Sequence, residues 1–180
     1  KKLFTNTKGA ALPLGPKGPS FRAVNRMKIG YFGAGTWGFA LASILANNGH
    51  KVTVWARDPN FAAQLQKNRT HPKLQGIEAP SSIAFTSDLK QAMHGAEAII
   101  ESVTSAGIRS VFERLGPVRV PIVLTSKGIE QGTGLLLPEV VSSVLGVEES
   151  PLVCCLSGPS HAEDIIMNLP TSVVCSAYDP

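Results

Sequence analysis

The stretch of sequence that decides the fold is KIGYFGAGTWGFALASILANNGHKVTVWARD, which spans residues 28–58. It begins with a short run typical of a strand, Lys28–Phe32, and Lys51–Ala56 is a second run of the same kind. Between them, Trp37–Asn47 is typical of a helix, and Asn48-Gly49 is a typical helix stop. A strand, a helix and a strand in this order predict a right-handed unit with two parallel strands.

The same alternation continues along the rest of the chain. Further strands are predicted at Ala84–Thr86, Ala98–Val103, Pro121–Thr125, Leu152–Leu156 and Ser172–Ser176, and further helices at Pro59–Arg69, Asp88–His94, Ile108–Leu115, Pro138–Leu145 and Ser160–Met167. This order predicts an α/β fold of Rossmann type: a doubly wound, mostly parallel sheet with helices on both faces. Glu101 lies within an otherwise apolar strand, and we expect it at a strand end or sheet edge rather than in the core.

Length and charge limit the classes of protein to which the chain can belong. Its 180 residues suit one globular domain, and no apolar stretch reaches the roughly 18 residues that span a bilayer. The net charge is +4, but residues 27–180 hold 11 basic and 13 acidic residues and have a net charge of −2. The high isoelectric point is therefore no sign of nucleic-acid binding. We expect a soluble, cytoplasmic protein without a nucleic-acid partner or a transmembrane segment.

The excess of positive charge comes from residues 1–26, which hold six basic residues and no acidic one. This stretch is rich in Lys, Gly and Pro and shows no sustained apolar period. Vector-derived residues, a targeting segment and a solvated arm all fit such a composition, and Met27 has the place of a natural start. We therefore predict a disordered or vector-derived extension at 1–26 and a single dinucleotide-binding domain at 27–180.

The cysteines, Cys154, Cys155 and Cys175, predict neither a metal site nor a disulfide framework. The chain has no Cys-x-x-Cys pair, and adjacent residues on a strand point to opposite faces of the sheet. We expect buried free thiols, which are typical of a reducing compartment.

A glycine loop, GAGTWG at residues 33–38, joins the first predicted strand to the first helix. In this context each glycine has a steric role: Gly33 permits a tight turn, Gly35 lets the backbone approach a diphosphate, and Gly38 lets the helix pack closely on the strands. The free N–H groups at the helix start then face the phosphates. The motif predicts an NAD(P) site, and the alternative is a glycine-rich turn without a ligand.

The end of the second strand bears on the choice of cofactor. Folds that prefer NAD place an acidic residue there to bind the ribose 2′-hydroxyl, whereas this chain has Arg57, followed by Asp58. A guanidinium binds a 2′-phosphate in a bidentate manner, so we expect NADP to be favoured over NAD. In the alternative interpretation, Arg57 is a solvated residue and Asp58 only caps the next helix.

Two further clusters follow predicted strands and so lie at the carboxyl edge of the sheet, where open α/β sheets bind ligands. Lys127, within TSKGIE at 125–130, provides a charge for a phosphate or a carbonyl oxygen. Ser157-Gly158-Pro159-Ser160 opens another helix with hydroxyl groups and a glycine. Each cluster alone fits an ordinary loop, but together with the glycine loop they predict one shared substrate pocket.

Motifs in a fixed order along residues 27–180 resemble NAD(P)-dependent glycerol-3-phosphate dehydrogenase of the bacterial type. They are GAGTWGFALA at 33–42, VTVWARD at 52–58, TSKGIEQGTG at 125–134, LSGPSHAED at 156–164 and LPTSVV at 169–174. The resemblance implies an oxidoreductase that interconverts dihydroxyacetone phosphate and sn-glycerol 3-phosphate with NAD(P)H, for glycerophospholipid synthesis. It thus implies a small phosphorylated substrate, and a homodimer is a possible assembly.

The resemblance also implies roles for single residues. Lys127 matches the lysine that touches both cofactor and substrate, and it is the candidate catalytic residue. Gly158 and Ser160 match substrate contacts. The remaining matches are cofactor contacts, and they comprise Gly33, Gly35, Thr36, Trp37, Gly38, Arg57 and Ala162.

The sequence departs from the family pattern at two places. Val103-Thr104-Ser105 stands where the family has Val-Pro-Ser, and because threonine lacks the fixed φ of proline, we expect the local loop to differ. His161 stands where an aromatic residue is common, and we interpret it as a packed helix residue rather than a catalyst.

The family continues into a helical carboxy-terminal domain that carries its proton-donating lysine. The resemblance therefore implies that this chain is the cofactor-binding part of the enzyme and is inactive alone. Two alternatives remain: another β-hydroxyacid-type dehydrogenase, and a stand-alone dinucleotide-binding module or redox sensor.

Overall fold

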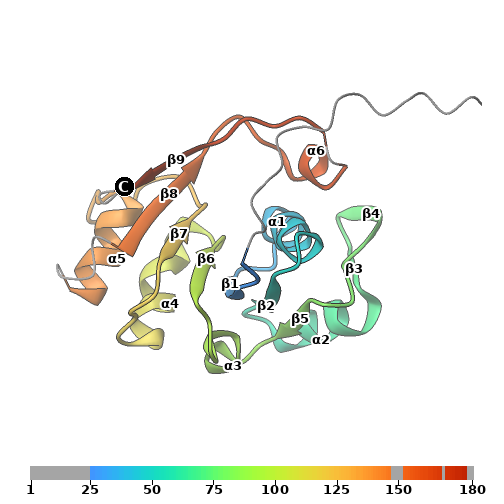
Figure 1. The fold of residues 1–180 in the computed structure, drawn as a ribbon. Coiled ribbons are helices and arrows are strands. Elements are labelled where there is room, and N and C mark those ends of the chain that lie inside the picture. The colour runs from blue at the N-terminus through green and yellow to red at the C-terminus, as the bar shows by residue number, and fades with distance from the viewer. Residues whose placement is uncertain (1–24, 147–151, 168, 178–180) are drawn as a thin grey trace, which may run out of the picture.

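Strand β1 (Lys28–Phe32) lies in the middle of a sheet, between β2 (Lys51–Trp55) and β6 (Ala98–Glu101). The computed structural model describes residues 25–146, 152–167 and 169–177, so the stretch 1–26 lies outside the described residues except for its last two. The sheet has seven strands in the order β5-β2-β1-β6-β7-β8-β9 (Figure 1). Its other strands are β5 (Ala84–Thr86), β7 (Ile122–Leu124), β8 (Val153–Ser157) and β9 (Val174–Ala177).

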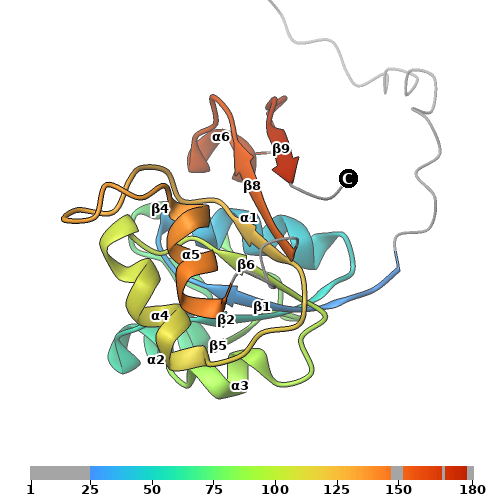
Figure 2. The ribbon, with the colours of Figure 1, turned by 90° about the vertical axis from the view of Figure 1, so that its left-hand side faces the viewer.

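Helices cover both faces of the sheet, as a doubly wound fold requires. One face carries α1 (Thr36–Asn47) and α2 (Pro59–Asn68), with α6 (Ala162–Ile166) packed against α1. On the other face lie α3 (Leu89–Met93), α4 (Ile108–Leu115) and α5 (Leu137–Leu145). Figure 2 shows α4 and α5 side by side on that face. The predicted fold class is confirmed.

The register of the sheet brings several loops together. Phe32 pairs with both Trp55 and Glu101, and Glu101 pairs with Leu124, so β1, β2, β6 and β7 end level with one another. All strand pairs from β5 to β8 are parallel. The loops that follow these strands therefore emerge at one edge, where the candidate site residues gather.

The helix ends follow the sequence signals. The Asp58 carboxylate accepts a hydrogen bond from the Asn60 N–H at 2.9 Å, and Pro59 occupies the first helical position of α2. At the end of α1, Gly49 has a φ of 92°, and its N–H donates to the Ala46 carbonyl at 3.0 Å.

The last strand differs from the predicted arrangement. β9 runs antiparallel to β8 at the sheet edge, with all its residues exposed. Because of this edge position Cys175 is exposed, and Cys154 and Cys155 on β8 are half-buried, so the expectation of buried thiols was wrong. All of these cysteines are free thiols.

A short antiparallel hairpin, β3 (Thr70–His71) with β4 (Leu74–Glu78), was not predicted. It follows α2, where Arg69 has a left-handed φ of 61° and donates to the carbonyls of Ile83 and Pro80. A strand of two residues has no periodicity, so the sequence carries no signal for it.

The described residues hold neither a membrane-spanning helix nor a metal cluster. No helix among them has the length and apolarity needed to cross a bilayer. Within the same residues, no group of three or more His, Cys, Asp or Glu side chains is arranged to hold a metal ion.

Candidate functional site

The glycine loop leaves no room for side chains at two of its glycines. Gly33 has a φ of 110°, and a Cβ there would lie 2.4 Å from the carbonyl oxygen of Ser102. A Cβ on Gly38 would lie 2.1 Å from the carbonyl oxygen of Gly33. These two glycines therefore allow the close packing of β1, α1 and the loop after β6, as the sequence predicted.

Gly35, in contrast, has open space beside it, because a Cβ there would meet no atom within 4 Å. It is the N-cap residue of α1, and no side chain caps this helix start. Gly35 lines a cleft of about 310 Å³ together with Gly33, Arg57, Ser102 and Val103. A free helix N-terminus that faces a cleft favours a phosphate.

Arg57 lies at the carboxyl end of β2, exposed on the same cleft. Its neighbour Asp58 is engaged in the cap of α2, so this carboxylate is already a hydrogen-bond acceptor. Among the described residues, no hydrogen bond or ion pair occupies the Arg57 guanidinium. Arg57 is thus the charged group at this end of the cleft that is available to a ligand.

A second pocket, of about 400 Å³, opens beside the first turn of α1. Its lining includes Thr36, Lys127, Ser160 and Ala162, which come from three separate segments. Ser102 and Val103, which form part of the glycine-loop cleft, also line this pocket. The two cavities therefore adjoin at these two residues, which form their common wall.

Lys127 is held near the SGPS loop by a direct contact. Its Nζ donates to the carbonyl oxygen of Gly158 at 2.9 Å, and the Ser160 hydroxyl lies 3.5 Å from the same oxygen. The structure thus brings together the three residues predicted for the substrate. An ammonium group has three protons, so the other two remain available for a ligand.

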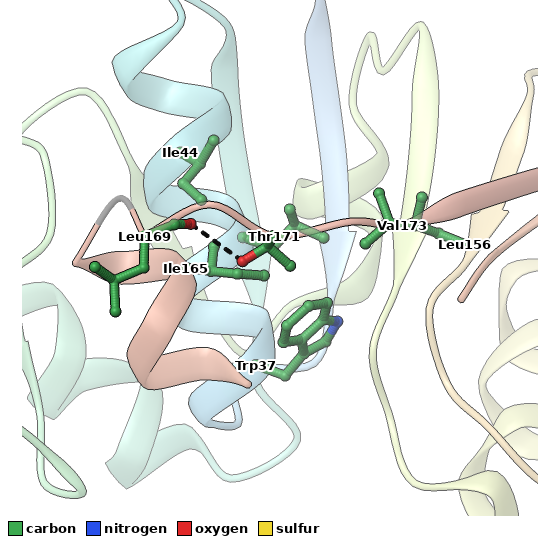
Figure 3. Close-up of a pocket in the computed structure, with 8 residues that line it drawn as sticks. Trp37, Ile44, Leu156, Ile165, Leu169, Thr171 and Val173 are labelled. Atoms are coloured by element: carbon green, nitrogen blue, oxygen red, sulfur yellow. Dashed lines mark hydrogen bonds between the residues drawn. The ribbon is translucent and has the colours of Figure 1, made fainter. Parts of the chain in front are cut away.

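Trp37 lies in an apolar groove between α1 and the segment that follows α6 (Figure 3), and it also lines the Lys127 pocket. Its indole N–H is buried and has no hydrogen-bond partner among the described residues. The groove has a volume of about 330 Å³, and Leu169 and Val173 on its rim are 48% and 45% exposed. Exposed apolar surface of this kind is typical of a contact with further protein.

Glu101 lies directly behind the common wall of the two cavities, a position that the sequence did not predict. It ends β6, as expected, but it is 0% exposed, because β6 lies between β1 and β7. Oε1 accepts a hydrogen bond from the Val103 N–H at 2.5 Å and lies 2.7 Å from the Ser126 hydroxyl, whereas Oε2 has no partner among the described residues. Burial raises the pKa of Glu101 to about 7, against the lowering effect of these hydrogen bonds. The signal available in the sequence was a carboxylate within an apolar strand.

We expect the titration of Glu101 to make the fold less stable as the pH rises. Its pKa in the fold, about 7, lies above the ordinary value of 4.5, so the unfolded chain releases this proton first. The contribution of protonated Glu101 to the free energy of unfolding is present below about pH 4.5 and lost above about pH 7. This is a change of about 3 kcal/mol. Tyr31 and Cys155 also lie near Glu101, but burial raises the pKa of both groups, so both stay neutral in this range.

Urea unfolding of the parent and of Glu101→Gln, at about pH 5 and pH 8, measures this effect. The variant should lose less stability than the parent between the two conditions. Equal losses in both chains would show that Glu101 does not titrate in this range.

Comparison with known proteins places this arrangement in a family. A family model described as "NAD-dependent glycerol-3-phosphate dehydrogenase N-terminus" matches residues 28–180. The chain belongs to this family. The match decides against the alternative of another β-hydroxyacid-type dehydrogenase.

Glycerol-3-phosphate dehydrogenase (NAD(P)+) of Protochlamydia amoebophila is 53% identical over 154 residues, which are 84% of this chain and 46% of that protein. The protein of the same name from Chlamydia pneumoniae is 50% identical over 157 residues, which are 86% of this chain and 47% of that protein. The crystal structure of glycerol-3-phosphate dehydrogenase from Coxiella burnetii matches with a TM-score of 0.78 at 31% identity, over 86% of this chain and 47% of that chain. The chain thus spans about half the length of the curated relatives that it matches.

The two departures from the dehydrogenase pattern have different outcomes. Thr104 has a φ of −66°, which is the value that proline would fix, so the expected change of this residue's backbone is absent. His161 is exposed on the Lys127 pocket, at the N-cap position of α6, so the expectation of a packed residue was wrong. An N-cap residue precedes the helix, which explains its exposure.

Proposed function

We propose that the chain is the cofactor-binding part of a cytoplasmic enzyme that interconverts dihydroxyacetone phosphate and sn-glycerol 3-phosphate with NAD(P)H, for glycerophospholipid synthesis. The observation that carries this proposal is the wall of Ser102 and Val103 shared by the glycine-loop cleft and the Lys127 pocket. A dinucleotide with its diphosphate at Gly35 has its adenosine end near Arg57 and its other end directed to Lys127. The reaction is taken from the relatives, which are glycerol-3-phosphate dehydrogenases.

The residues of the cleft fit a dinucleotide. The open side of Gly35 and the uncapped start of α1 suit the diphosphate, and Arg57 suits a 2′-phosphate. We assign the remaining cofactor contacts to Thr36, Trp37 and Ala162, as the resemblance implies. When bound, the nicotinamide ring supplies or accepts the hydride.

Lys127 is the candidate catalytic residue of this part of the enzyme. Its contact with Gly158 fixes Nζ at the pocket and leaves two protons for the carbonyl oxygen or the phosphate of the substrate. A positive charge at the carbonyl oxygen stabilises the negative charge that develops there during reduction. Ser160 and Gly158 lie beside it and complete the proposed contacts to the substrate.

We assign the proton donor and the rest of the phosphate site to the second half of the relatives' length. The apolar groove beside Trp37 suits the docking of that half, because burial of Leu169 and Val173 against it removes apolar surface from water. A homodimer remains part of the proposal.

Reduction of dihydroxyacetone phosphate by NADPH, measured in a chain extended to the relatives' full length, tests the proposal. Turnover supports the dehydrogenase. Dinucleotide binding without turnover by the extended chain would favour the stand-alone binding module or redox sensor.

Arg57→Asp is expected to reverse the cofactor preference. The parent should bind NADPH more tightly than NADH, because Arg57 offers a guanidinium to the 2′-phosphate. In the variant, the carboxylate repels this phosphate and accepts a hydrogen bond from the 2′-hydroxyl of NADH, so we expect a combined change of about a hundredfold in the ratio of affinities. Calorimetric titration of both cofactors measures this ratio.

Lys67→Asp is the matched control for Arg57→Asp. Lys67 is exposed in the last turn of α2, outside the residues that line the cleft, so the same change of charge there should leave the ratio of affinities unaltered. Equal affinities of the parent for the two cofactors, unchanged in Arg57→Asp, would contradict the assignment of Arg57.

A further inference from the structure

The backbone of Val103 is held on both sides by the same pair of side chains. Its N–H donates to Oε1 of Glu101 at 2.5 Å, and its carbonyl oxygen accepts from the hydroxyl of Ser126 at 2.5 Å. The Ser126 hydroxyl also lies 2.7 Å from Oε1 of Glu101. These contacts join the loop after β6 to the loop after β7, and we call them the Val103 clamp.

The Val103 clamp lies where the two cavities meet. Val103 and Ser102 form the common wall of the glycine-loop cleft and the Lys127 pocket. Ser126 directly precedes Lys127, so the same hydroxyl that holds Val103 also fixes the start of the segment that carries the ammonium group. The position of this wall therefore sets the distance between the reactive end of a bound dinucleotide and Lys127.

The hydrogen-bond geometry favours one more proton than an ionised Glu101 provides. The Ser126 hydroxyl has one proton but lies within 2.7 Å of two oxygens, Oε1 of Glu101 and the carbonyl oxygen of Val103. A protonated Glu101 donates to Ser126, and Ser126 donates to Val103, so that each close contact contains a proton. No basic side chain forms an ion pair with Glu101 among the described residues, and burial without such a pair favours the neutral acid.

We propose that Glu101, in its protonated form, is a positioning residue that fixes the Val103 peptide between the dinucleotide cleft and the Lys127 pocket. The proposal rests on the proposed dehydrogenase function. Glu101 touches neither ligand, and it acts through the common wall. Thr104 follows Val103 in this loop and, unlike a proline, does not fix its own φ. The clamp therefore holds a loop that has no proline to restrict it.

Thr104 provides a way to restore the loop without the clamp. Its φ of −66° lies where proline is fixed, and no described residue accepts a hydrogen bond from its N–H. The turn behind it is closed by the Gly107 N–H, which donates to the Thr104 carbonyl at 2.7 Å. Thr104→Pro should therefore fit this backbone and restrict the loop even when the clamp is broken.

Binding measurements on the 180-residue chain test the role of the clamp. Ser126→Ala and Glu101→Ala should each weaken NADPH binding by about tenfold, the typical effect of one lost buried hydrogen bond. ADP-ribose, which lacks the nicotinamide, should bind with nearly unchanged affinity, because it fills the cleft from the Arg57 end. Glu101→Gln, whose amide oxygen can still accept from the Val103 N–H but offers Ser126 no proton there, should lose less NADPH affinity than Glu101→Ala. Thr104→Pro should restore binding in Ser126→Ala.

Three results would overturn the proposal. An equal loss of ADP-ribose affinity would mean that Glu101 and Ser126 support only the general fold. A loss in Glu101→Gln as large as that in Glu101→Ala would mean that the contact with the Val103 N–H does not hold the loop. A failure of Thr104→Pro to restore binding in Ser126→Ala would mean that the position of the loop does not matter.

Amide hydrogen exchange tests the clamp independently of the proposed function, because it needs no bound dinucleotide. Amides of residues 102–107 should exchange faster in Ser126→Ala than in the parent, and Thr104→Pro should reverse this, whether or not a dinucleotide binds. A parent that binds no dinucleotide but shows these exchange rates would contradict the proposed function and support the clamp. Ser126→Ala keeps Glu101 intact, so it tests the loop even if Glu101→Ala does not fold. Unchanged amide exchange in Ser126→Ala would overturn the clamp itself.

Discussion

A Gly35→Val chain is expected to keep its fold and to lose dinucleotide binding by about a hundredfold or more. The φ of Gly35 is −66° and its ψ is 179°, an extended backbone that valine readily adopts. A side chain there meets no atom of the protein within 4 Å, but it occupies the space beside the start of α1 that the diphosphate needs. As an N-cap, valine costs about 1 kcal/mol, so the melt should stay cooperative and shift by only a few degrees.

Gly38→Ala is the matched control for this substitution. Its methyl group would lie 2.1 Å from the carbonyl oxygen of Gly33, where neither backbone can move without disturbing β1 or α1. We expect a loss of about 3 kcal/mol or more in the free energy of unfolding. Thermal melts and NADPH titrations of both variants measure the two effects. Parental affinity in Gly35→Val would show that the loop does not hold the phosphates.

The sequence predicted the parts of the fold that local patterns determine. The helix Ile108–Leu115 was placed with its observed bounds, because its apolar residues recur at helical spacing. The glycine loop was placed correctly between β1 and α1, because a strand, three spaced glycines and a helix leave few other arrangements. The placing of Lys127 and Gly158 at one edge followed from a topological rule, since both residues come after parallel strands. Their direct contact was not predicted.

The features that the sequence did not predict depend on neighbours that are distant along the chain. The burial of Glu101 is decided by β1 and β7 on either side, and its pattern alone fits a strand end at the surface equally well. The antiparallel direction of β9 depends on the route of the chain around α6, which periodicity does not encode. Thr104 likewise has the φ of a proline without being one, next to Val103, whose carbonyl is held by Ser126 from a distant loop.

The largest expected effect concerns catalysis. This chain should bind NADPH but leave dihydroxyacetone phosphate unreduced, whereas a chain extended to the relatives' full length should turn over. Hydride transfer to a ketone requires a nicotinamide, a positioned carbonyl group and a proton donor in one site. The chain offers the glycine-loop cleft for the nicotinamide. For the carbonyl group it offers part of the site, with Lys127, Gly158 and Ser160.

A missing proton donor alone lowers a rate by about 10²–10⁴-fold, and the loss of the wall that excludes water adds to this. The exposed residues of the groove, among them Leu169 at 48%, should also make the short chain self-associate, and the extended chain should do so less. The measurements are NADPH oxidation and sedimentation of both chains at matched concentrations. Turnover by the short chain within about tenfold of the extended one would place the proton donor among residues 27–180. The proton would then have to come from Lys127 or from His161, which also lines the described pocket.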